Sequence, residues 1–316
     1  MATDVGNRRA ARTEGERPAK LPARAWAGVV KRTFREFSAD NLTDWAAALT
    51  YYGVLSIFPA LVALISILGL VGQSATNPLL KNLGGFAPGA AHQILANALH
   101  GLANSRGGAG ILFVVGLAGA VWSAAGYIGG FIRASNVIWD VEEGRPFWKT
   151  IPLRLVVTLV MLVLLTASAV MVVVTGPLAH KVGTLIGIGS AAVTAWDIAK
   201  WPVLVLIVSL MFSILYYASP NVRQPKFRWV TPGSVLAVVV WIAASALFAV
   251  YVAKFGSYNK TYGSLGAVII FLVWLWLTNV AILLGAELNA EIERGRQIEA
   301  GQPEDREPFL PPRDAP

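Results

Sequence analysis

The chain has no cysteine and only three histidines among its 316 residues. Disulfides, thiolate metal sites and cysteine nucleophiles are therefore excluded, and little imidazole remains for acid–base chemistry. Charge is scarce as well, because Asp, Glu, Lys and Arg make up 14% of the residues against about 25% in a soluble domain. No nucleotide-binding loop, dinucleotide fingerprint or nucleophile elbow occurs. We therefore expect no cofactor, no bound metal and no catalytic residues.

Long apolar segments are what the sequence does contain. Hydrophobic residues make up 55% of the chain, and the mean hydropathy is +0.59. A membrane-spanning helix needs about 20 apolar residues without charge. Six segments meet this condition, and we predict spans at about 46–70, 109–131, 153–176, 200–218, 233–253 and 266–286. The predicted fold class is all-α: a polytopic membrane bundle of six helices, with amphipathic interfacial helices.

Two further segments lack charge but do not read as spans. Residues 82–105 contain Gly, Pro, His and Asn, and their apolar residues recur at helical spacing. This pattern predicts an amphipathic helix at the interface, over about 89–104. Residues 182–196 are too short to cross a bilayer, so we predict a re-entrant or surface segment. A seventh span there would place the two termini on opposite sides.

Positive charge is distributed unevenly between the two sides of this topology. Twenty of the 26 Lys and Arg lie on the side that holds both termini. Lys and Arg accumulate on the cytoplasmic side of membrane proteins, so both termini are predicted to be cytoplasmic. The predicted organisation is a disordered basic tail (1–25), a membrane domain (26–295) and a disordered Pro-rich tail (296–316).

A basic amphipathic helix is expected just before the first span. Apolar residues from Trp26 to Phe37 recur on one face, and Lys31, Arg32 and Arg35 lie elsewhere. We interpret this segment as a helix on the anionic lipids of the inner leaflet. The alternative is ordinary orientation charge followed by a solvated tail. A nucleic-acid partner is not expected, because most membrane proteins show the same bias.

Three motifs carry a resemblance to a known family. They are Asp40-Asn41-Leu42 with the following Ala46–Pro59 segment, Trp122-Ser123-Ala124 with Arg133 and Asn136, and Phe255–Gly266 with Gly285-Ala286-Glu287-Leu288-Asn289-Ala290. Over about residues 30–295 the chain resembles the YihY/virulence factor BrkB family of bacterial inner-membrane proteins. The resemblance implies six spans and an inner-membrane location. The activity of that family is unsettled, and its former label was ribonuclease BN.

Polar residues at the inner ends of the spans form the first candidate site. Glu287 lies at the inner end of the sixth span, where an acidic group is costly unless it is paired or hydrated. Arg133 and Arg154 are predicted on the same side. The candidate inner-side polar cluster consists of Asp40, Asn41, Arg133, Asn136, Glu287 and Asn289. We expect a Glu287–Arg133 pair, which either locks the helix ends together or forms a headgroup, ion or proton site.

A proline inside the first span marks a second candidate site. Pro59 removes a backbone hydrogen bond and kinks the helix. The candidate cavity or gate comprises Tyr51, Tyr52, Ser56 and Pro59, and a simple packing kink is the alternative.

A short loop between the fifth and sixth spans is the third candidate. It is dense in Gly, Tyr, Asn and Lys, and its candidate residues are Tyr258, Asn259, Lys260, Tyr262 and Gly263. These form either a connecting turn or a lid over an outward-facing cavity.

The second predicted span contains small residues at four-residue spacing, among them Gly126 and Gly130. Such faces let helix backbones approach closely. They indicate packing within the chain, with a homo-oligomer or another membrane protein as the alternative partner.

Three functions remain open. The first is a transport-type or lipid-handling protein, with phospholipid or another amphiphile as substrate. The second is a non-catalytic scaffold or assembly factor. The third is a membrane-bound ribonuclease, which we disfavour because His92, His100 and His180 are predicted on the outer side. An enzyme is therefore not expected.

Overall fold

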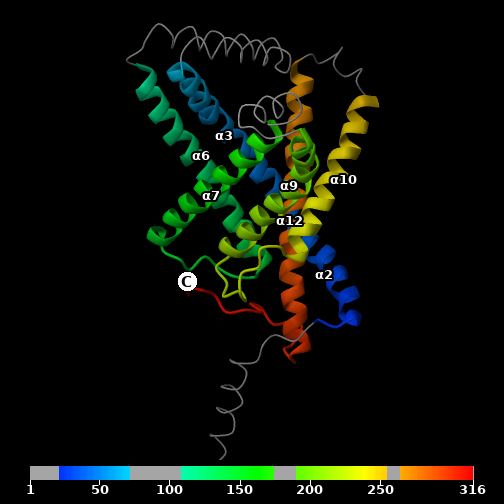
Figure 1. Ribbon diagram of the computed structural model, residues 1–316. Coiled ribbons are helices and arrows are strands. Elements are labelled where there is room, and N and C mark those ends of the chain that lie inside the picture. The colour runs from blue at the N-terminus through cyan, green and yellow to red at the C-terminus, as the bar shows by residue number, and fades with distance from the viewer. Residues whose placement is uncertain (1–20, 72–107, 174–189, 255–263, 316) are drawn as a thin grey trace, which may run out of the picture.

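The computed structural model of the protein describes residues 21–71, 108–173, 190–254 and 264–315 (Figure 1). Within these residues the chain is helical, and one isolated β-bridge is the only strand-like pairing. The elements are η1 (Ala23–Ala25), α2 (Trp26–Ala39), α3 (Leu42–Val71), α6 (Gly108–Ile138), α7 (Phe147–Val173), α9 (Ser190–Ala218), α10 (Pro232–Lys254) and α12 (Ser264–Glu299). The predicted all-α class is confirmed.

Five helical segments are long and apolar enough to cross a membrane. They are Val114–Ile138, Phe147–Ser168, Val193–Ala218, Pro232–Val252 and Val268–Glu299. The chain is thus a multi-pass membrane protein. The first predicted span, 46–70, coincides with α3, but the side chains of residues 57–71 lie outside the described part. The count of six spans therefore stays a prediction.

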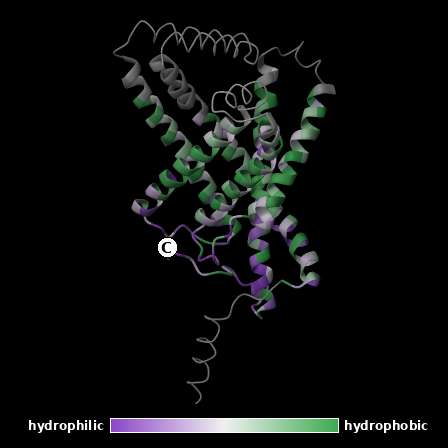
Figure 2. Cartoon of the chain, viewed as in Figure 1, coloured by the Kyte–Doolittle hydropathy of each residue, from purple (hydrophilic) through white to green (hydrophobic). Residues whose placement is uncertain are grey.

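Hydrophilic residues gather at one end of the bundle (Figure 2). We call this the polar end: it comprises α2, the connections 139–146 and 219–231, and residues 287–315. Apolar residues cover the parts of the helices that lie away from the polar end (Figure 2). The largest fully buried side chains include Phe131, Leu42, Leu49, Ile132 and Leu283, which come from α3, α6 and α12. These three helices form the centre of the hydrophobic core.

Glycines set the closest helix contacts. A Cβ on Gly130 would lie 3.1 Å from the Tyr52 ring and 3.2 Å from Leu49, so the small-residue face of α6 packs against α3, as predicted. A Cβ on Gly285 would collide with the backbone oxygen of Gly233, and a Cβ on Gly233 would collide with that of Gly285. Consequently α10 and α12 meet backbone to backbone, as small residues allow in membrane bundles.

α12 extends well beyond the predicted sixth span. Ion pairs three residues apart, between Glu291 and Arg294 and between Glu293 and Arg296, support its polar half. Gly301 ends the helix with φ of 92°, while the amide of Gln302 donates to the Gln297 carbonyl. This is a Schellman termination. The extension carries the last turns of α12 into the polar end.

α9 begins earlier than predicted. It starts at Ser190 and runs through Lys200, where the predicted span begins. Residues 190–196, part of the predicted re-entrant or surface segment, are therefore the first turns of this helix. Lys200 is buried and lies 5.6 Å from the ring of Trp201. The helix therefore continues through a charge that marks a boundary in the sequence alone, with the ring of the next residue beside the Lys200 ammonium group. Residues 182–189 lie outside the described residues.

The C-terminal segment also differs from its prediction. Residues 300–315 were expected to be disordered, but they pack along the polar end. Phe309 is 4% exposed and stacks on Trp139 at 5.3 Å between ring centroids, and Val222 pairs with Pro312 in a β-bridge. Leu21 similarly packs beside Val29 and Ile292, within the predicted N-terminal tail. Composition indicated disorder, but aromatic and arginine side chains in these segments find partners on the bundle.

Some apolar residues of α2 are buried against the bundle, and others are exposed. Val29 and Thr33 are buried, with Val29 clustered against Leu288 and Ile292 of α12. Trp26, Val30 and Phe34 are exposed at four-residue spacing. The predicted apolar face is therefore divided between the bundle and the surroundings. Its contact with lipid stays a prediction.

Candidate functional site at the polar end

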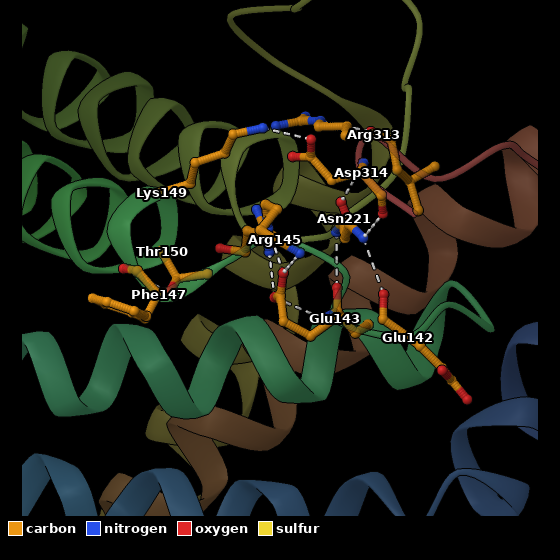
Figure 3. A network of polar contacts seen from close by, with 12 residues as sticks. Glu142, Glu143, Arg145, Phe147, Lys149, Thr150, Asn221, Arg313 and Asp314 are labelled. Atoms are coloured by element: carbon orange, nitrogen blue, oxygen red, sulfur yellow. Dashed lines mark hydrogen bonds and ion pairs between the residues drawn. The ribbon is translucent and has the colours of Figure 1, made fainter. Parts of the chain in front are cut away.

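Asn221 is the centre of a network that joins three segments (Figure 3). Its backbone amide donates to Asn136 Oδ1 at 2.8 Å. Its side-chain Nδ2 donates to the carbonyls of Glu142 at 3.0 Å and Asp314 at 2.8 Å. Since Asn221 is completely buried, these bonds are shielded from water. They fix the α6–α7 connection, the α9–α10 connection and the C-terminal segment to one another.

A bidentate pair of Glu143 and Arg145 adjoins this network (Figure 3). Arg145 donates to the two carboxylate oxygens at 2.6 and 2.7 Å, and also to the Ser219 carbonyl at 2.8 Å. Asn136 donates to the same carboxylate at 3.0 Å. Burial raises the pKa of Glu143, but the bonds from Arg145 and Asn136 outweigh it, so the pKa falls below its ordinary value. Asn136 therefore has a structural role in this network.

Arg313 and Asp314 attach the end of the chain. Arg313 donates to the Val222 carbonyl at 2.7 Å and the Tyr217 carbonyl at 2.6 Å. Asp314 accepts from Lys149 Nζ at 2.6 Å. Sequence reasoning missed these contacts, because nothing in a Pro-rich tail indicates where an arginine will find backbone carbonyls.

A second cluster is built around Arg294 of α12. The guanidinium pairs with Asp140, with Glu291 at 3.2 Å and with Glu307 at 4.0 Å. It also lies 4.8 Å from the ring centroid of Phe309. Glu291 is shared with Arg32 of α2, whose Nε lies 2.6 Å from it. One arginine therefore connects α12, the end of α6 and the C-terminal segment.

Glu287 lies one turn from Glu291 and is 1% exposed. Its Oε2 has no hydrogen-bond partner among the residues that the structure describes. The charged groups acting on it are Asp40, Glu291 and Glu36, with Arg294 as the compensating cation. The expected pair with Arg133 does not form within the described residues: Arg133 instead donates to the Tyr52 hydroxyl at 3.0 Å. The predicted cluster is therefore divided, because Arg133 faces α3 while Glu287 faces α2.

Asp40 and Asp140 are the titratable groups at the edge of the Arg294 cluster. Burial, and after it the negative charges of Asp140 and Glu36, raises the pKa of Asp40 to about 7. Burial likewise raises the pKa of Asp140 to about 6, although Arg294 acts against the shift. Carboxylates therefore outnumber cations in the Arg294 cluster. Protonation of a carboxylate near neutral pH reduces this excess of negative charge.

The remaining residues of the predicted inner-side cluster make turn and helix-end contacts. Asn41 has φ of 51°, and its side chain donates to the Ala39 carbonyl at 3.3 Å. Asparagine tolerates this left-handed conformation, which permits the sharp α2–α3 turn. Asn289 accepts from the Gly233 amide and donates to Thr231 Oγ1, each at 2.9 Å. It thereby holds the start of α10 against α12.

The predicted cavity or gate falls on α3. Tyr51 is 62% exposed, whereas Tyr52 contacts Arg133 and packs on α6. Ser56 donates to the Gly53 carbonyl at 2.6 Å. α3 continues through Pro59, whose side chain lies outside the described part. The outer-loop candidates, Tyr258, Asn259, Lys260, Tyr262 and Gly263, and the predicted helix 89–104 also lie outside the described residues.

A buried hydrogen-bonded chain in the apolar half was not predicted. Tyr127 donates to Asn279 Oδ1 at 2.8 Å, and Asn279 Nδ2 donates to Thr50 Oγ1 at 3.0 Å. It links α3, α6 and α12. Asn279 lies in the middle of an apolar span, and a polar residue there is the signal that could have revealed it.

A lateral cavity of about 740 Å³ lies between α6, α7 and α9. Its lining is apolar apart from one threonine, and includes Leu117, Val121, Leu159, Leu162, Thr166 and Trp196. Cavities of about 300–1,000 Å³ typically hold small molecules. The arrangement is a polar end joined by hydrogen bonds and ion pairs and an apolar lateral cavity in the spanning half.

The family model described as "Virulence factor BrkB" matches residues 33–308. The chain belongs to the BrkB family. A relative named as ribonuclease-like, YfkH of Bacillus subtilis, is 29% identical over 85% of this chain and 96% of its own length. A UPF0761 membrane protein of Aromatoleum aromaticum is 32% identical over 84% of this chain, which spans 64% of that relative. One from Vibrio vulnificus is 28% identical over 86% of this chain and 85% of its own length. No solved structure matches the chain.

These similarities support the family suggested by the sequence motifs. The printed names describe the relatives as membrane proteins and, in one case, as ribonuclease-like. Among the described residues, no three His, Cys, Asp or Glu side chains are grouped so that they could hold a metal ion.

Proposed function

We propose that this BrkB-family protein binds phospholipid or a similar amphiphile and moves it within the bilayer. The lateral cavity between α6, α7 and α9 is the observation that carries the proposal. We further propose that the protein lies in the inner membrane with its polar end, and both termini, in the cytoplasm. The 20-to-6 division of Lys and Arg supports that orientation.

The cavity suits an acyl chain better than an ion. Its lining supplies one hydroxyl, from Thr166, among Leu, Val, Ala, Met and Trp side chains. An ion would need several polar ligands or compensating charges in the spanning region, whereas an acyl chain needs only apolar contacts. The polar end supports the proposal of an acyl chain as the occupant, because the polar networks hold the helix ends together at some distance from the cavity, which lies in the apolar half.

Reconstituted vesicles test this proposal directly. Purified protein is inserted into vesicles that contain a fluorescent phospholipid, and movement between leaflets is followed by chemical quenching of the outer label. We expect wild-type protein to accelerate this movement and Leu162→Trp to slow it several-fold by filling the cavity. Leu165→Trp is the matched control, because Leu165 is on the same helix but outside the cavity lining. Wild-type protein that moves no lipid under any gradient would refute the proposal.

Two alternative functions have their own outcomes. A stoichiometric membrane partner that co-purifies with an inactive protein would favour a scaffold, for which the exposed stripe of Trp26, Val30 and Phe34 offers a surface. Metal-dependent RNA cleavage that disappears in Asp40→Ala and Glu287→Ala variants would favour a nuclease.

A further inference from the structure

A small pocket on the side of the bundle contains an arginine in apolar surroundings. The pocket has a volume of about 160 Å³ and is lined by Trp122, Ala125, Gly126, Ile151, Arg154 and Leu155. It lies between α6 and α7, and Arg154 belongs to the spanning segment Phe147–Ser168. An ionisable side chain within such a segment is costly and usually marks a functional site.

The charge of Arg154 has no counter-ion in the described part of the chain. Its Nε is buried and lacks a hydrogen-bond partner. By contrast, Arg32, Arg145 and Arg294 each pair with a carboxylate. A Cβ on Gly129 would lie 3.0 Å from the Arg154 Cζ, so the guanidinium lies directly against the backbone of α6. The missing side chain at Gly129 thus makes room for this arginine.

Arg133 adds a second charge on the same face of α6 that has no counter-ion among the described residues. It lies one helical turn from Gly129, toward the polar end. Its hydrogen-bond partner, the Tyr52 hydroxyl, is neutral, and Arg133 itself is exposed. Trp122, 71% exposed, lies on this face too. Two arginines and an exposed tryptophan therefore occur together at the side of a membrane bundle.

We infer that Arg154 binds the phosphate group of an anionic phospholipid in this pocket, and that Arg133, one turn of α6 from Gly129, contributes from outside the pocket lining. The planar guanidinium fork matches phosphate geometry, and basic pockets between membrane helices bind anionic headgroups. A bilayer supplies this anion attached to acyl chains, which the exposed Trp122 and neighbouring apolar side chains accommodate. The inference deepens the proposed function, on which it rests for the class of ligand, by naming a headgroup site.

Native mass spectrometry with added phosphatidylglycerol tests the inference. We expect Arg154→Gln to weaken binding about tenfold or more, because it removes charge-assisted hydrogen bonds. Arg133→Gln should weaken it less, and Arg154→Lys should retain part of the affinity. Lys149→Gln is the matched control: it removes one positive charge from the same helix, at an exposed residue paired with Asp314. Its binding should equal that of the wild type.

Three results would overturn the inference. The first is unchanged binding by Arg154→Gln that elutes as folded protein, and the second is an equal loss in Lys149→Gln, which would indicate general attraction to basic residues. The third is displacement of the lipid by inorganic phosphate at similar concentration, which would identify free phosphate as the ligand. If Arg154→Gln loses binding while wild-type vesicles move no lipid, the site stands and the proposed transport fails. If wild-type vesicles move lipid and Arg154→Gln binds normally, the site alone fails.

Discussion

Asp40→Asn should change how the stability of the protein depends on pH. The pKa of Asp40 rises from 3.8 to about 7 on folding, because of burial and then the charges of Asp140 and Glu36. The folded protein therefore keeps this proton at pH values where the unfolded chain has lost it. The contribution of Asp40 to stability is greatest below about pH 4, decreases as pH rises from about 4 to 7, and stays reduced above that range.

The size of the change in stability follows from the shift in the pKa of Asp40. Three pKa units correspond to about 4 kcal/mol at roughly 1.36 kcal/mol per unit. Asp40 is only half-buried, so solvent screening reduces the expected penalty to about 1–2 kcal/mol. For a protein of this size that is roughly 2–6 °C in Tm. Asparagine has a similar shape and no charge, so the variant should avoid the penalty.

Thermal melting in detergent, followed by tryptophan fluorescence, measures this directly. Wild-type protein should melt at lower temperature at pH 8.5 than at pH 5. Asp40→Asn should melt at nearly the wild-type temperature at pH 5 and several degrees higher than wild type at pH 8.5. Asp305→Asn, at an exposed residue of the C-terminal segment, should follow the wild-type profile. A variant that keeps the wild-type slope, or melts lower at pH 8.5, would contradict the assigned excess of negative charge.

Three further predictions concern packing, and the second has Gly301→Ala as its control. Asn279→Leu should destabilise the protein by about 1 kcal/mol in chemical unfolding, because Tyr127 loses its acceptor; an unchanged midpoint would contradict a stabilising network. Gly285→Ala should abolish the monodisperse peak in gel filtration, because its Cβ meets the backbone of Gly233. Gly301→Ala meets no neighbour and should cost about 1 kcal/mol through its positive φ. Phe309→Ala should expose the segment after Glu299 to limited proteolysis, and resistance equal to the wild type would show that Phe309 does not anchor it.

Hydropathy located the spanning helices because each apolar segment must satisfy its own backbone hydrogen bonds in lipid. Five of the predicted spans therefore coincide with long apolar helices. A charged residue was a less reliable marker of where a spanning helix begins. Lys200 marked the start of a span in the sequence, yet α9 begins ten residues earlier, and the buried Lys200 side chain lies beside the ring of Trp201 without interrupting the helix.

At the candidate site, too, the partners predicted from the sequence differ from those in the structure. The sequence grouped Glu287, Asp40 and Arg133 into one inner-side polar cluster. It paired Glu287 with Arg133, whereas the structure places Arg294 near Glu287 and Tyr52 beside Arg133. Residues on the same side of a membrane have many arrangements that satisfy their charges, and helix rotation selects among them.

The amino-acid sequence alone was enough to establish that this chain is a multi-pass helical membrane protein. The reason is that transfer of an apolar segment into lipid depends only on the composition of that segment. The tertiary structure alone decided which polar groups meet, that residues 300–315 pack on the bundle, and that Arg154 lies in a lateral pocket with no counter-ion from the described part of the chain. Those outcomes depend on the rotation and crossing of helices, which contacts distant in the sequence determine.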